Sequence, residues 1–484
     1  MKKLFFICLL FCKSISFSQT ILNSFPLNLN EPSFSQLLNV QDVKTKDVYV
    51  FASDNKDIKI LKYNQSLFLT QQFTDSIKFA KDRNLIGYSI GEDQSPLLYW
   101  STKNYNNLRI IKYNLNSKTT KSLNFDFPSN HDYIVTTFQK ENVFYILAKE
   151  KQQPHLLLYK FENGNCEIKM FDFSAFAFQN GAGKNFSFSL LILRYPIQKA
   201  DTDSYNPLDK TAAINKMYVV DNHIILTLDY SPKKTQVFDL NIETAEIKEK
   251  TFNLPVSTTA IKAANSFYSD KKLFQIAANK DVFLFDVKDY ESGETIKSLS
   301  VTKNDSITFK NSPFFLQMND NKPQELKTTA KFLKSLSDLG AGISVLKSRK
   351  NSFITFGGFV EFRDYYYGAY ADDILAAAPI EYSQSKMVYF ESLFDENFNF
   401  VKSRQSEPLA LDNLFYFLSI SKNIALQNIL KLDDYYILTY YDTSSKQLFI
   451  RRFTDGYINL DPGNPIMNKS LFSQPFSFEK IKSR

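Results

Sequence analysis

Cysteine and glycine are both scarce in this chain of 484 residues, with 3 and 13 copies. Cys8 and Cys12 lie in an N-terminal segment that is expected to be removed, which leaves Cys166 alone. The remaining chain therefore has no pair of cysteines for a disulfide and no cysteine-based metal site. Cys166 lies in an expected strand and is interpreted as a small buried apolar residue. The stretch 181–184 lacks the other residues of a phosphate-binding loop, so it predicts a turn.

The sequence also lacks the residue spacings that are typical of known catalytic and metal sites. The three histidines, His131, His155 and His223, are far apart and match no metal-ligand pattern. His223 lies in an apolar stretch and is expected in the core. No Gly-x-Ser-x-Gly sequence marks a nucleophile, although a Ser-His-Asp arrangement depends on the fold rather than on spacing. No metal and no other cofactor is expected.

Residues 1–18 have the three parts of a signal peptide. Two lysines follow the first methionine, an apolar run covers 4–11, and small residues occupy the two positions that a signal peptidase reads. We therefore expect cleavage before Gln19 and a secreted or periplasmic protein. The apolar run is too short to span about 30 Å of hydrocarbon, and no later segment approaches ~20 consecutive apolar residues, so no transmembrane segment is expected.

Charge is spread along the chain rather than concentrated. The formal net charge is +7, and the leader holds three of the lysines, which leaves about +4 for the rest. Lysines and acids are interspersed as on an ordinary solvated surface, so no nucleic-acid partner is expected. Aromatic residues, by contrast, are abundant, with 46 Phe and 27 Tyr. Such enrichment, with little helical patterning, favours β-strands.

A hairpin pattern recurs along almost the whole chain. An apolar strand ends on an aromatic residue, a tight polar turn follows, and a more polar strand comes next. The base spacing near 48 residues matches a four-stranded propeller blade. The pattern occurs seven times, closing at Tyr63-Asn64, Tyr113-Asn114, Phe161-Glu162, Phe238-Asp239, Phe285-Asp286, Phe394-Asp395 and Phe453-Thr454.

The strands around each closing residue have different characters. The polar strands that follow it suit the outer edge of a blade, and Thr244–Thr251 and Thr295–Ser300 are expected there. Residues 20–45 are expected to supply a strand to the last blade and so close the ring. Continuous apolar runs before the closing residues suit strands covered on both faces. These runs are Val48–Ala52, Val143–Ala148, His223–Leu228 and Tyr435–Tyr440.

Two gaps between closing residues exceed the base spacing. The gap of 77 residues contains 174–215, which is interpreted as a long loop or a partly stranded insertion. The gap of 109 residues suggests a helical and loop insertion near 310–384, and its alternative is a degenerate eighth blade. Residues 324–339 predict a short helix that stops at Gly340. The apolar residues with near-helical spacing there are Leu326, Ala330, Leu333, Leu336 and Leu339.

Residues 19–484 resemble a secreted bacterial β-propeller, and the end of the leader, Phe17-Ser18-Gln19, resembles the leaders of secreted proteins from Bacteroidetes. The resemblance to propellers concerns architecture, because the sequence has no tryptophan-aspartate, kelch or Asp-box signature. We expect one all-β propeller domain with about seven four-stranded blades, and six or eight blades are the alternatives.

Residues 201–209 place oxygen-bearing side chains at alternating positions, as calcium loops do. However, Tyr205 occupies the third ligand position, Asn206 replaces the glycine, and Ala212 stands where a bidentate Glu is needed. The stretch is therefore interpreted as an ordinary polar surface loop.

Residues 357–382 form the most unusual segment, rich in tyrosine and in charge. Tyrosine rings can stack on sugars or peptides, and Arg and Asp can orient a polar ligand. We expect any ligand site in this insertion, and the alternative is that the tyrosines form the strand face of a blade. The candidate binding residues are Arg363, Asp364, Tyr366, Tyr370, Asp372 and Asp373.

These features favour an exported, non-catalytic propeller that binds an unknown glycan or protein ligand or serves as a scaffold. One alternative is a propeller-fold glycan hydrolase or lyase, which needs two carboxylates about 5–10 Å apart in the central funnel. Another is an accessory subunit of an export or gliding machine, which would expose a large apolar patch on one rim. The sequence decides neither enzymatic activity nor oligomeric state.

Overall fold

The computed structural model describes residues 19–29, 35–77, 83–127, 131–179, 183–319, 321–348, 350–366, 380–402 and 408–456. The expected signal peptide lies outside the described residues. Strands dominate the described part of the chain, and none of its helices is long and apolar enough to cross a membrane.

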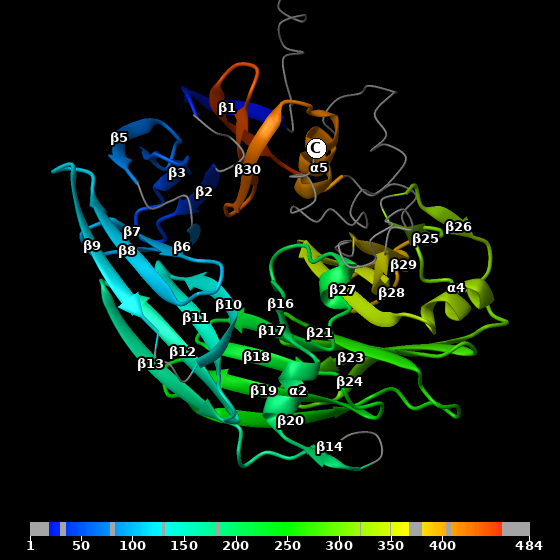
Figure 1. The fold of residues 1–484 in the computed structure, drawn as a ribbon. Coiled ribbons are helices and arrows are strands. Elements are labelled where there is room, and N and C mark those ends of the chain that lie inside the picture. The colour runs from blue at the N-terminus through cyan, green and yellow to red at the C-terminus, as the bar shows by residue number, and fades with distance from the viewer. Residues whose placement is uncertain are drawn as a thin grey trace, which may run out of the picture.

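Seven sheets of four or five strands follow one another in chain order around a common centre (Figure 1). Neighbouring strands in these sheets are antiparallel, except that β16 and β17 pair in parallel. The chain is therefore a seven-bladed β-propeller, as the repeat predicts. From the centre outwards, blade one contains β2 (Gln36–Gln41), β3 (Val48–Ser53), β4 (Asp57–Tyr63) and β5 (Leu69–Ser76). Blade two contains β6 (Asn84–Ile90), β7 (Pro96–Ser101), β8 (Asn107–Asn114) and β9 (Thr119–Asp126). Blade three contains β10 (His131–Lys140), β11 (Val143–Glu150), β12 (His155–Glu162) and β13 (Asn165–Asp172).

The other four blades include two with a fifth strand. Blades four and five contain β16 (Ile197–Lys199), β17 (Asn215–Val220), β18 (His223–Leu228), β19 (Lys234–Asn241) and β20 (Ile247–Asn253); and β21 (Ala263–Ser269), β22 (Lys272–Ala278), β23 (Val282–Asp289) and β24 (Thr295–Thr302). Blade six contains, from the centre outwards, β27 (Gly340–Ser348), β28 (Asn351–Tyr366), β29 (Ile380–Phe394), β25 (Phe314–Met318) and β26 (Gln324–Leu326). Blade seven contains β30 (Ile424–Lys431), β31 (Tyr436–Asp442), β32 (Gln447–Phe453) and β1 (Gln19–Pro26).

The first strand of the chain completes the last blade. β1 pairs antiparallel with β32 along its length, from Gln19 opposite Phe453 to Pro26 opposite Gln447. The expected closure of the ring is confirmed, and the closing strand occupies only the start of the predicted stretch, because residues 36–41 already form the inner strand of blade one.

Each closing aromatic residue of the sequence pattern lies in the third strand of one blade, counted from β17 in blade four, so the seven patterns mark seven blades. Phe238 and Phe285 lie inside their strands, and the other five lie within one residue of the strand end. All seven side chains are buried. The four continuous apolar runs become second strands, namely β3, β11, β18 and β31, and the two polar stretches become the outer strands β20 and β24. These predictions are confirmed, because a second strand is covered by sheets on both faces while an outer strand meets solvent.

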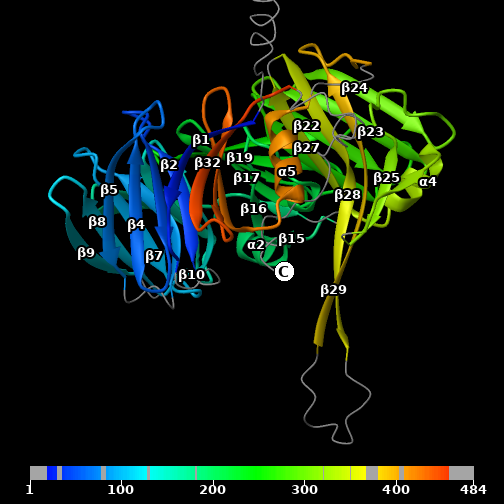
Figure 2. The same ribbon diagram turned by 90° about the horizontal axis from the view of Figure 1, so that it is seen from above.

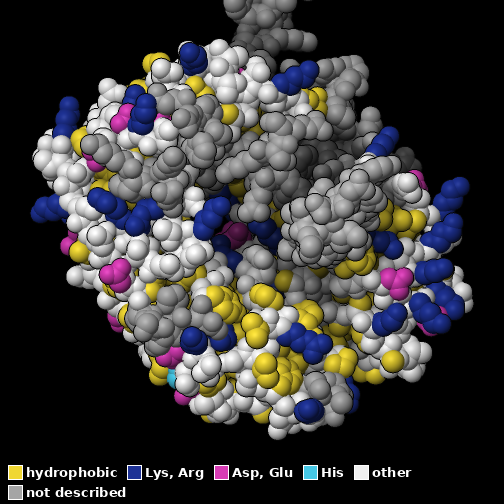
Figure 3. Space-filling model, viewed as in Figure 1, with side chains coloured by type: hydrophobic (Ala, Val, Ile, Leu, Met, Phe, Trp, Pro, Cys, Tyr) yellow, Lys and Arg dark blue, Asp and Glu magenta, His cyan; other side chains and the backbone are white. Residues whose placement is uncertain are grey.

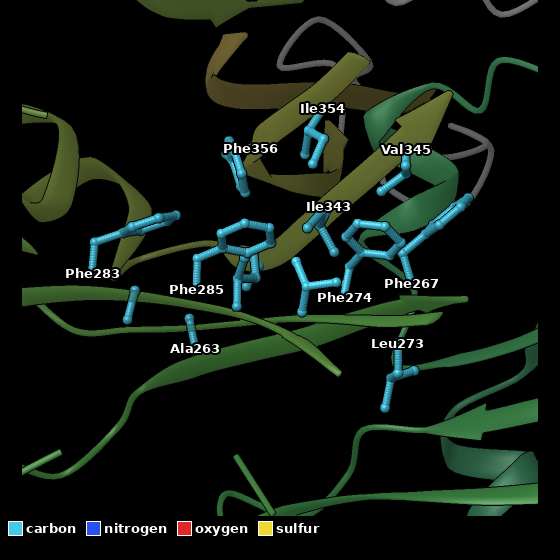
Figure 4. Close-up of a cluster of buried hydrophobic side chains, with 14 of the residues drawn as sticks. Ala263, Phe267, Leu273, Phe274, Phe283, Phe285, Ile343, Val345, Ile354 and Phe356 are labelled. Carbon is cyan, nitrogen blue, oxygen red and sulfur yellow. The ribbon is translucent and has the colours of Figure 1, made fainter. Parts of the chain in front are cut away.

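The core lies between the facing sheets of neighbouring blades. Figure 4 shows one such layer, in which side chains of β22 and β23 meet those of β27 and β28. Phe356 of blade six lies edge-on to Phe283 and Phe285 of blade five, with ring centroids 5.6 and 4.8 Å apart. Such edge-to-face contacts add about 0.5–1.5 kcal/mol each to the burial of the rings.

The two long gaps hold extra elements rather than an extra blade in the described part of the chain. The longer gap supplies β25, β26 and helix α4 (Thr329–Leu336) to blade six. The predicted helix is confirmed with a later start, because Thr328 caps it by accepting from the Lys331 N–H at 3.3 Å. The shorter gap contains β14 (Phe178–Gln179), β15 (Asn185–Phe186), α2 (Phe188–Arg194), β16 and α3 (Leu208–Thr211). A further helix, α5 (Ala410–Ile420), packs on β31 and β32 and was not expected from the sequence.

Deleting residues 19–26 should open the ring. The edge of β32 then loses its partner, and the half-buried side chains of Leu22 and Phe25 leave the core beneath them. The free energy of unfolding should fall by about 3 kcal/mol or more, and the bare edge should promote self-association. Denaturant unfolding and light scattering measure both effects. The control is Ile21→Ser at an exposed position, which should change stability by about 0.5 kcal/mol or less. An equally stable, monomeric deletion variant would contradict closure by β1.

Candidate functional site

The hairpin of β28 and β29 is the longest departure from the repeat. Its two strands pair with each other as far as Tyr366 in β28. Pairing of β27 with β28 ends at Phe359, and pairing of β25 with β29 ends at Lys386. Beyond those positions the described hairpin consists of its own two strands alone, and Figure 2 shows it projecting from the disc. Asn319 also holds the backbone of Ser385, since its N–H donates to the Ser385 carbonyl at 2.8 Å and its Oδ1 accepts from the Ser385 N–H at 2.7 Å. We call residues 360–366 and 380–384 the ribbon.

Three of the six candidate binding residues lie in the ribbon. The segment from 357 to 366 is strand throughout, so its first residues belong to the blade and its later ones extend that strand outwards. The candidates in β28 are Arg363, Asp364 and Tyr366. The other three, Tyr370, Asp372 and Asp373, lie outside the described residues. A role of these six residues in ligand binding stays a prediction.

Gly357 and Gly358 let two helices approach the base of the ribbon. A Cβ atom on Gly357 would lie 2.8 Å from Leu208 Cδ2 of α3, and one on Gly358 would lie 2.7 Å from Leu336 Cδ1 of α4. Successive residues of a strand face opposite ways, so the two helices lie against opposite faces of β28. Two adjacent glycines inside an apolar strand are the sequence signal that could have revealed this close approach.

The connection into blade four reaches across to blades six and seven. After β16, residues 200–207 lead into α3, which packs against β27 and β28. The Ser344 hydroxyl of β27 donates to the Asn206 carbonyl at 2.6 Å, and the Lys431 ammonium of β30 donates to the Asp203 carbonyl at 2.6 Å. The chain itself therefore fills space between blades four, six and seven.

The polar loop 201–206 is held together by one amide side chain. The Asp201 N–H donates to Asn206 Oδ1 at 2.8 Å, and the Asn206 amide group donates to the Asp201 carbonyl at 2.6 Å and the Ser204 carbonyl at 3.0 Å. Tyr205 packs against α5, and burial raises its pKa well above the ordinary value. No group of three metal-ligating side chains occurs among the described residues. The residues that replace calcium-loop positions therefore have structural partners of their own.

Two carboxylates lie at the start of α5. Asp412 Oδ2 accepts from the Leu409 N–H at 2.8 Å, and Asp455 Oδ1 accepts from the Ala410 N–H at 2.8 Å. The pKa of Asp412 is raised to about 6. Burial is the main cause and the nearby Asp455 charge adds to it, while the hydrogen bond from the Leu409 N–H acts in the opposite direction. Both side chains satisfy N–H groups that a helix start leaves open, so their arrangement is that of helix caps.

His155 and His223 pair with carboxylates on neighbouring strands. His155 Nδ1 lies 2.6 Å from Glu150 Oε2, and His223 Nδ1 lies 2.5 Å from Asp239 Oδ1. The expectation of a core position for His223 is wrong, because it starts β18 and its side chain is 40% exposed. The two pairs belong to different blades, and Cys166 of β13 is half-buried, with burial raising the pKa of its thiol to about 12. Cys166 was expected to be a small buried apolar residue, and it lies in a strand and packs against the core but is only partly buried.

The exposed side of α2 is apolar, and it lies on the side of the disc from which the ribbon projects (Figure 2). Leu190 and Leu193 are 57% and 64% exposed, and the partly buried Phe186 and Tyr195 belong to the same region. Figure 3 shows hydrophobic side chains gathered over this part of the face. The ribbon and this surface make one side of the propeller the candidate functional face.

No protein-family model and no curated protein matches this chain. It is similar to solved structures that include Hsv2 of Kluyveromyces lactis, with 8% identity over 88% of this chain and 100% of that one and a TM-score of 0.31. The WD40 domain of SCAP from fission yeast matches at 9% identity over 92% and 98%, with a TM-score of 0.31. A post-proline cleaving enzyme from Rickettsia typhi matches at 10% identity over 84% of this chain and 50% of that one, with a TM-score of 0.30. Likenesses this distant carry no argument about function.

Replacing Asp412 with Asn should change how stability depends on pH. The pKa of Asp412 is about 6 in the folded protein and near 3.8 when unfolded, so the folded state binds more protons between these values. This carboxyl group therefore favours folding most below pH 4, and its contribution falls by up to about 3 kcal/mol as the pH rises through 6.

The measurement is urea unfolding of wild type and Asp412→Asn from pH 4 to 7. The variant should gain stability relative to wild type across this range, because its amide has no charge to bury. Asp434→Asn on an exposed turn is the matched control and should follow the wild-type profile. A difference between Asp412→Asn and wild type that does not change with pH would show that Asp412 is not a buried acid.

Proposed function

We propose that this protein is an exported, non-catalytic binding module that engages an extended segment of a partner protein through the ribbon. The single observation that carries the proposal is the pairing of β28 and β29 beyond both of their neighbours. A two-stranded ribbon is marginally stable by itself in water. Its outward extension therefore adds little to the stability of the propeller and has to be explained by what it binds.

The chemistry of the ribbon favours a polypeptide partner. Beyond Phe359 in β28 and Ser385 in β29, the two outer edges of the hairpin have no strand partner among the described residues. Strand edges carry backbone donors and acceptors that accept an added strand, and side-chain contacts then supply specificity. Phe362 supplies an apolar contact, since its side chain is 49% exposed. We infer that Arg363, Asp364 and Tyr366 contribute further contacts on the same strand.

The residues around the centre of the propeller favour a binding role and do not favour glycan hydrolysis. A hydrolase needs two accessible carboxylates, one of which holds a proton near neutral pH. Asp412 has the raised pKa, but it is buried and caps α5. The segment from β16 to α3 also fills space between blades four, six and seven.

A photo-crosslinking amino acid at position 362 should form a discrete product with a partner protein in the producing cells. The same residue at position 68 is the matched control, because Phe68 is 68% exposed and lies in the turn before β5, away from the ribbon. Phe362→Ser and Tyr366→Ala should each weaken binding of the identified partner by about 1–3 kcal/mol. The unfolding midpoint should stay near that of wild type.

Equal crosslinking from positions 68 and 362 would contradict the ribbon as the binding element. If Tyr366→Ala binds normally and unfolds at a much lower temperature, that tyrosine belongs to the folded core and not to the site. A glycan that competes for the ribbon in the absence of any protein product would replace the polypeptide partner by a sugar.

The exported protein should begin at Gln19. Cleavage there removes the whole charged and apolar leader and leaves β1 complete, since this strand starts at the same residue. N-terminal sequencing of protein from the periplasm or the medium should read Gln-Thr-Ile-Leu. Protein that keeps Met1 and stays inside the cell would contradict export.

A further inference from the structure

Three exposed apolar side chains lie on the outer strands of blades two and three. Leu123 of β9 is 52% exposed, and Ile168 and Met170 of β13 are 47% and 49% exposed. Both strands lie at the rim of the ring (Figure 1). Single exposed apolar residues are ordinary on a protein surface, so these three matter only if they lie together.

The three side chains face the same layer between blades two and three. Residues opposite each other in paired strands point to the same side of a sheet. Leu123 is opposite Ile110, and Ile168 is opposite Tyr159. Ile110 and Tyr159 belong to one buried cluster, which the facing sheets of blades two and three share. Met170 follows Ile168 by two positions and therefore faces the same side.

A ring contact between the two blades joins these side chains into one surface. Phe125, two residues after Leu123, has its ring centroid 5.2 Å from that of Phe161 in blade three. Cys166 is opposite Phe161, packs against the same cluster and precedes Ile168 by two positions. We give the name apolar strip to Leu123, Phe125, Cys166, Ile168 and Met170.

The outer parts of other neighbouring blades meet through polar contacts. Gln71 of β5 donates to Asn116 of blade two at 2.7 Å. On the other face of β13, Lys169 donates to the Glu243 carbonyl of blade four at 2.7 Å. Polar and charged side chains ordinarily protect an outer strand from pairing with another chain. The apolar strip departs from that rule, and its exposure is explained by a segment that covers it.

β13 offers a backbone edge beside its apolar side chains. In the described part of the chain it pairs only with β12, so its outer edge has backbone groups available for an added strand. An added strand places a side chain about 5 Å from each residue of β13. Its alternate residues would extend the apolar strip, and its intervening residues would lie on the face of Glu167 and Lys169. The occupant that fits has apolar residues at every second position and polar residues between them.

The size of the apolar strip favours a short segment over a folded partner. Three half-exposed aliphatic side chains offer on the order of 200 Å² of apolar surface. Each partner in a stable protein complex buries about 800 Å², so a contact between two copies of this chain would have too little apolar surface. A bilayer would leave the backbone edge of β13 without hydrogen-bond partners. An extended polypeptide supplies both the backbone groups and the side chains.

We propose that the edge of β13 binds an extended polypeptide segment with apolar residues at alternate positions, which adds a fifth strand to blade three and covers the apolar strip. Blade six shows that this architecture accepts a fifth strand at the rim, since β26 lies outside its other four strands. The site belongs to blade three and the ribbon belongs to blade six. Failure of the ribbon to bind a partner therefore has no consequence for this site.

The test is selection of peptides from a display library of random short sequences on the whole exported chain. Enriched sequences should carry apolar residues at alternate positions with polar residues between them. A synthetic peptide of the enriched sequence should bind the double variant Ile168→Ser, Met170→Ser at least about tenfold more weakly than wild type, because two apolar contacts are lost. The unfolding midpoint of this strip variant should stay near that of wild type, because both side chains are half exposed.

The matched control is the double variant Leu69→Ser, Ile296→Ser. It removes two exposed apolar side chains from the outer strands β5 and β24. This control should bind the peptide as wild type does, and so should Phe362→Ser in the ribbon. The proposal is overturned if no enriched peptide distinguishes wild type from the strip variant, or if the control loses as much affinity. Enriched peptides without apolar alternation would also overturn it.

Three other occupants of the apolar strip would each overturn the proposal. If wild type sediments as a dimer and the strip variant as a monomer, a second copy of the chain covers the strip. If peptides bind only after deletion of residues 457–484, the chain's own last segment covers it. If wild type binds anionic-lipid vesicles and the strip variant does not, the occupant is a membrane surface.

Discussion

The structure depends on the pairing of the first strand with the last hairpin. Each sheet of a propeller has two apolar faces, which are buried mainly by the sheets beside it, and in blade seven also by helix α5. A row of seven such sheets would leave two faces in water, and a closed ring leaves none. β1 completes blade seven by pairing with β32, so the first and last described strands hold the ring together, without a disulfide in the described part of the chain.

Closure frees the connections between strands to vary. The cores lie between facing sheets, as with Phe283, Phe285 and Phe356 between blades five and six. Residues outside those layers therefore contribute less to stability. Two insertions occur in these connections. One is the segment from β14 to α3, and the other consists of β25, β26 and α4, which are added to blade six. Gly357 and Gly358 admit α3 and α4 against the two faces of β28, and from that support the ribbon extends beyond the blade.

Much of the architecture could be predicted from local pattern. The closing aromatics lie in the third strand of all seven blades, counted from β17 in blade four, because this strand needs a large buried apolar side chain. The start of α4 could not be placed from apolar spacing, because Leu326 belongs to a strand that also needs one buried face. Helix α5 was missed because its run of apolar residues resembles a buried strand at this length. His223 was misplaced because an apolar neighbourhood in sequence does not show where a strand leaves the core.

The sequence by itself predicted the repeating blade, its covered second strands and its polar outer strands, because these follow from apolar periodicity and turn residues within each repeat. It left the number of blades at about seven and the closing strand somewhere within 20–45, and the structure fixed both. The candidate site was predicted only as a segment, 357–382, without its shape. Tertiary structure decided that β28 and β29 extend beyond their neighbouring strands and that Asp412 is buried as a helix cap. These properties depend on which elements lie side by side in space, and pairing between distant segments is not encoded in the spacing of residues along the chain.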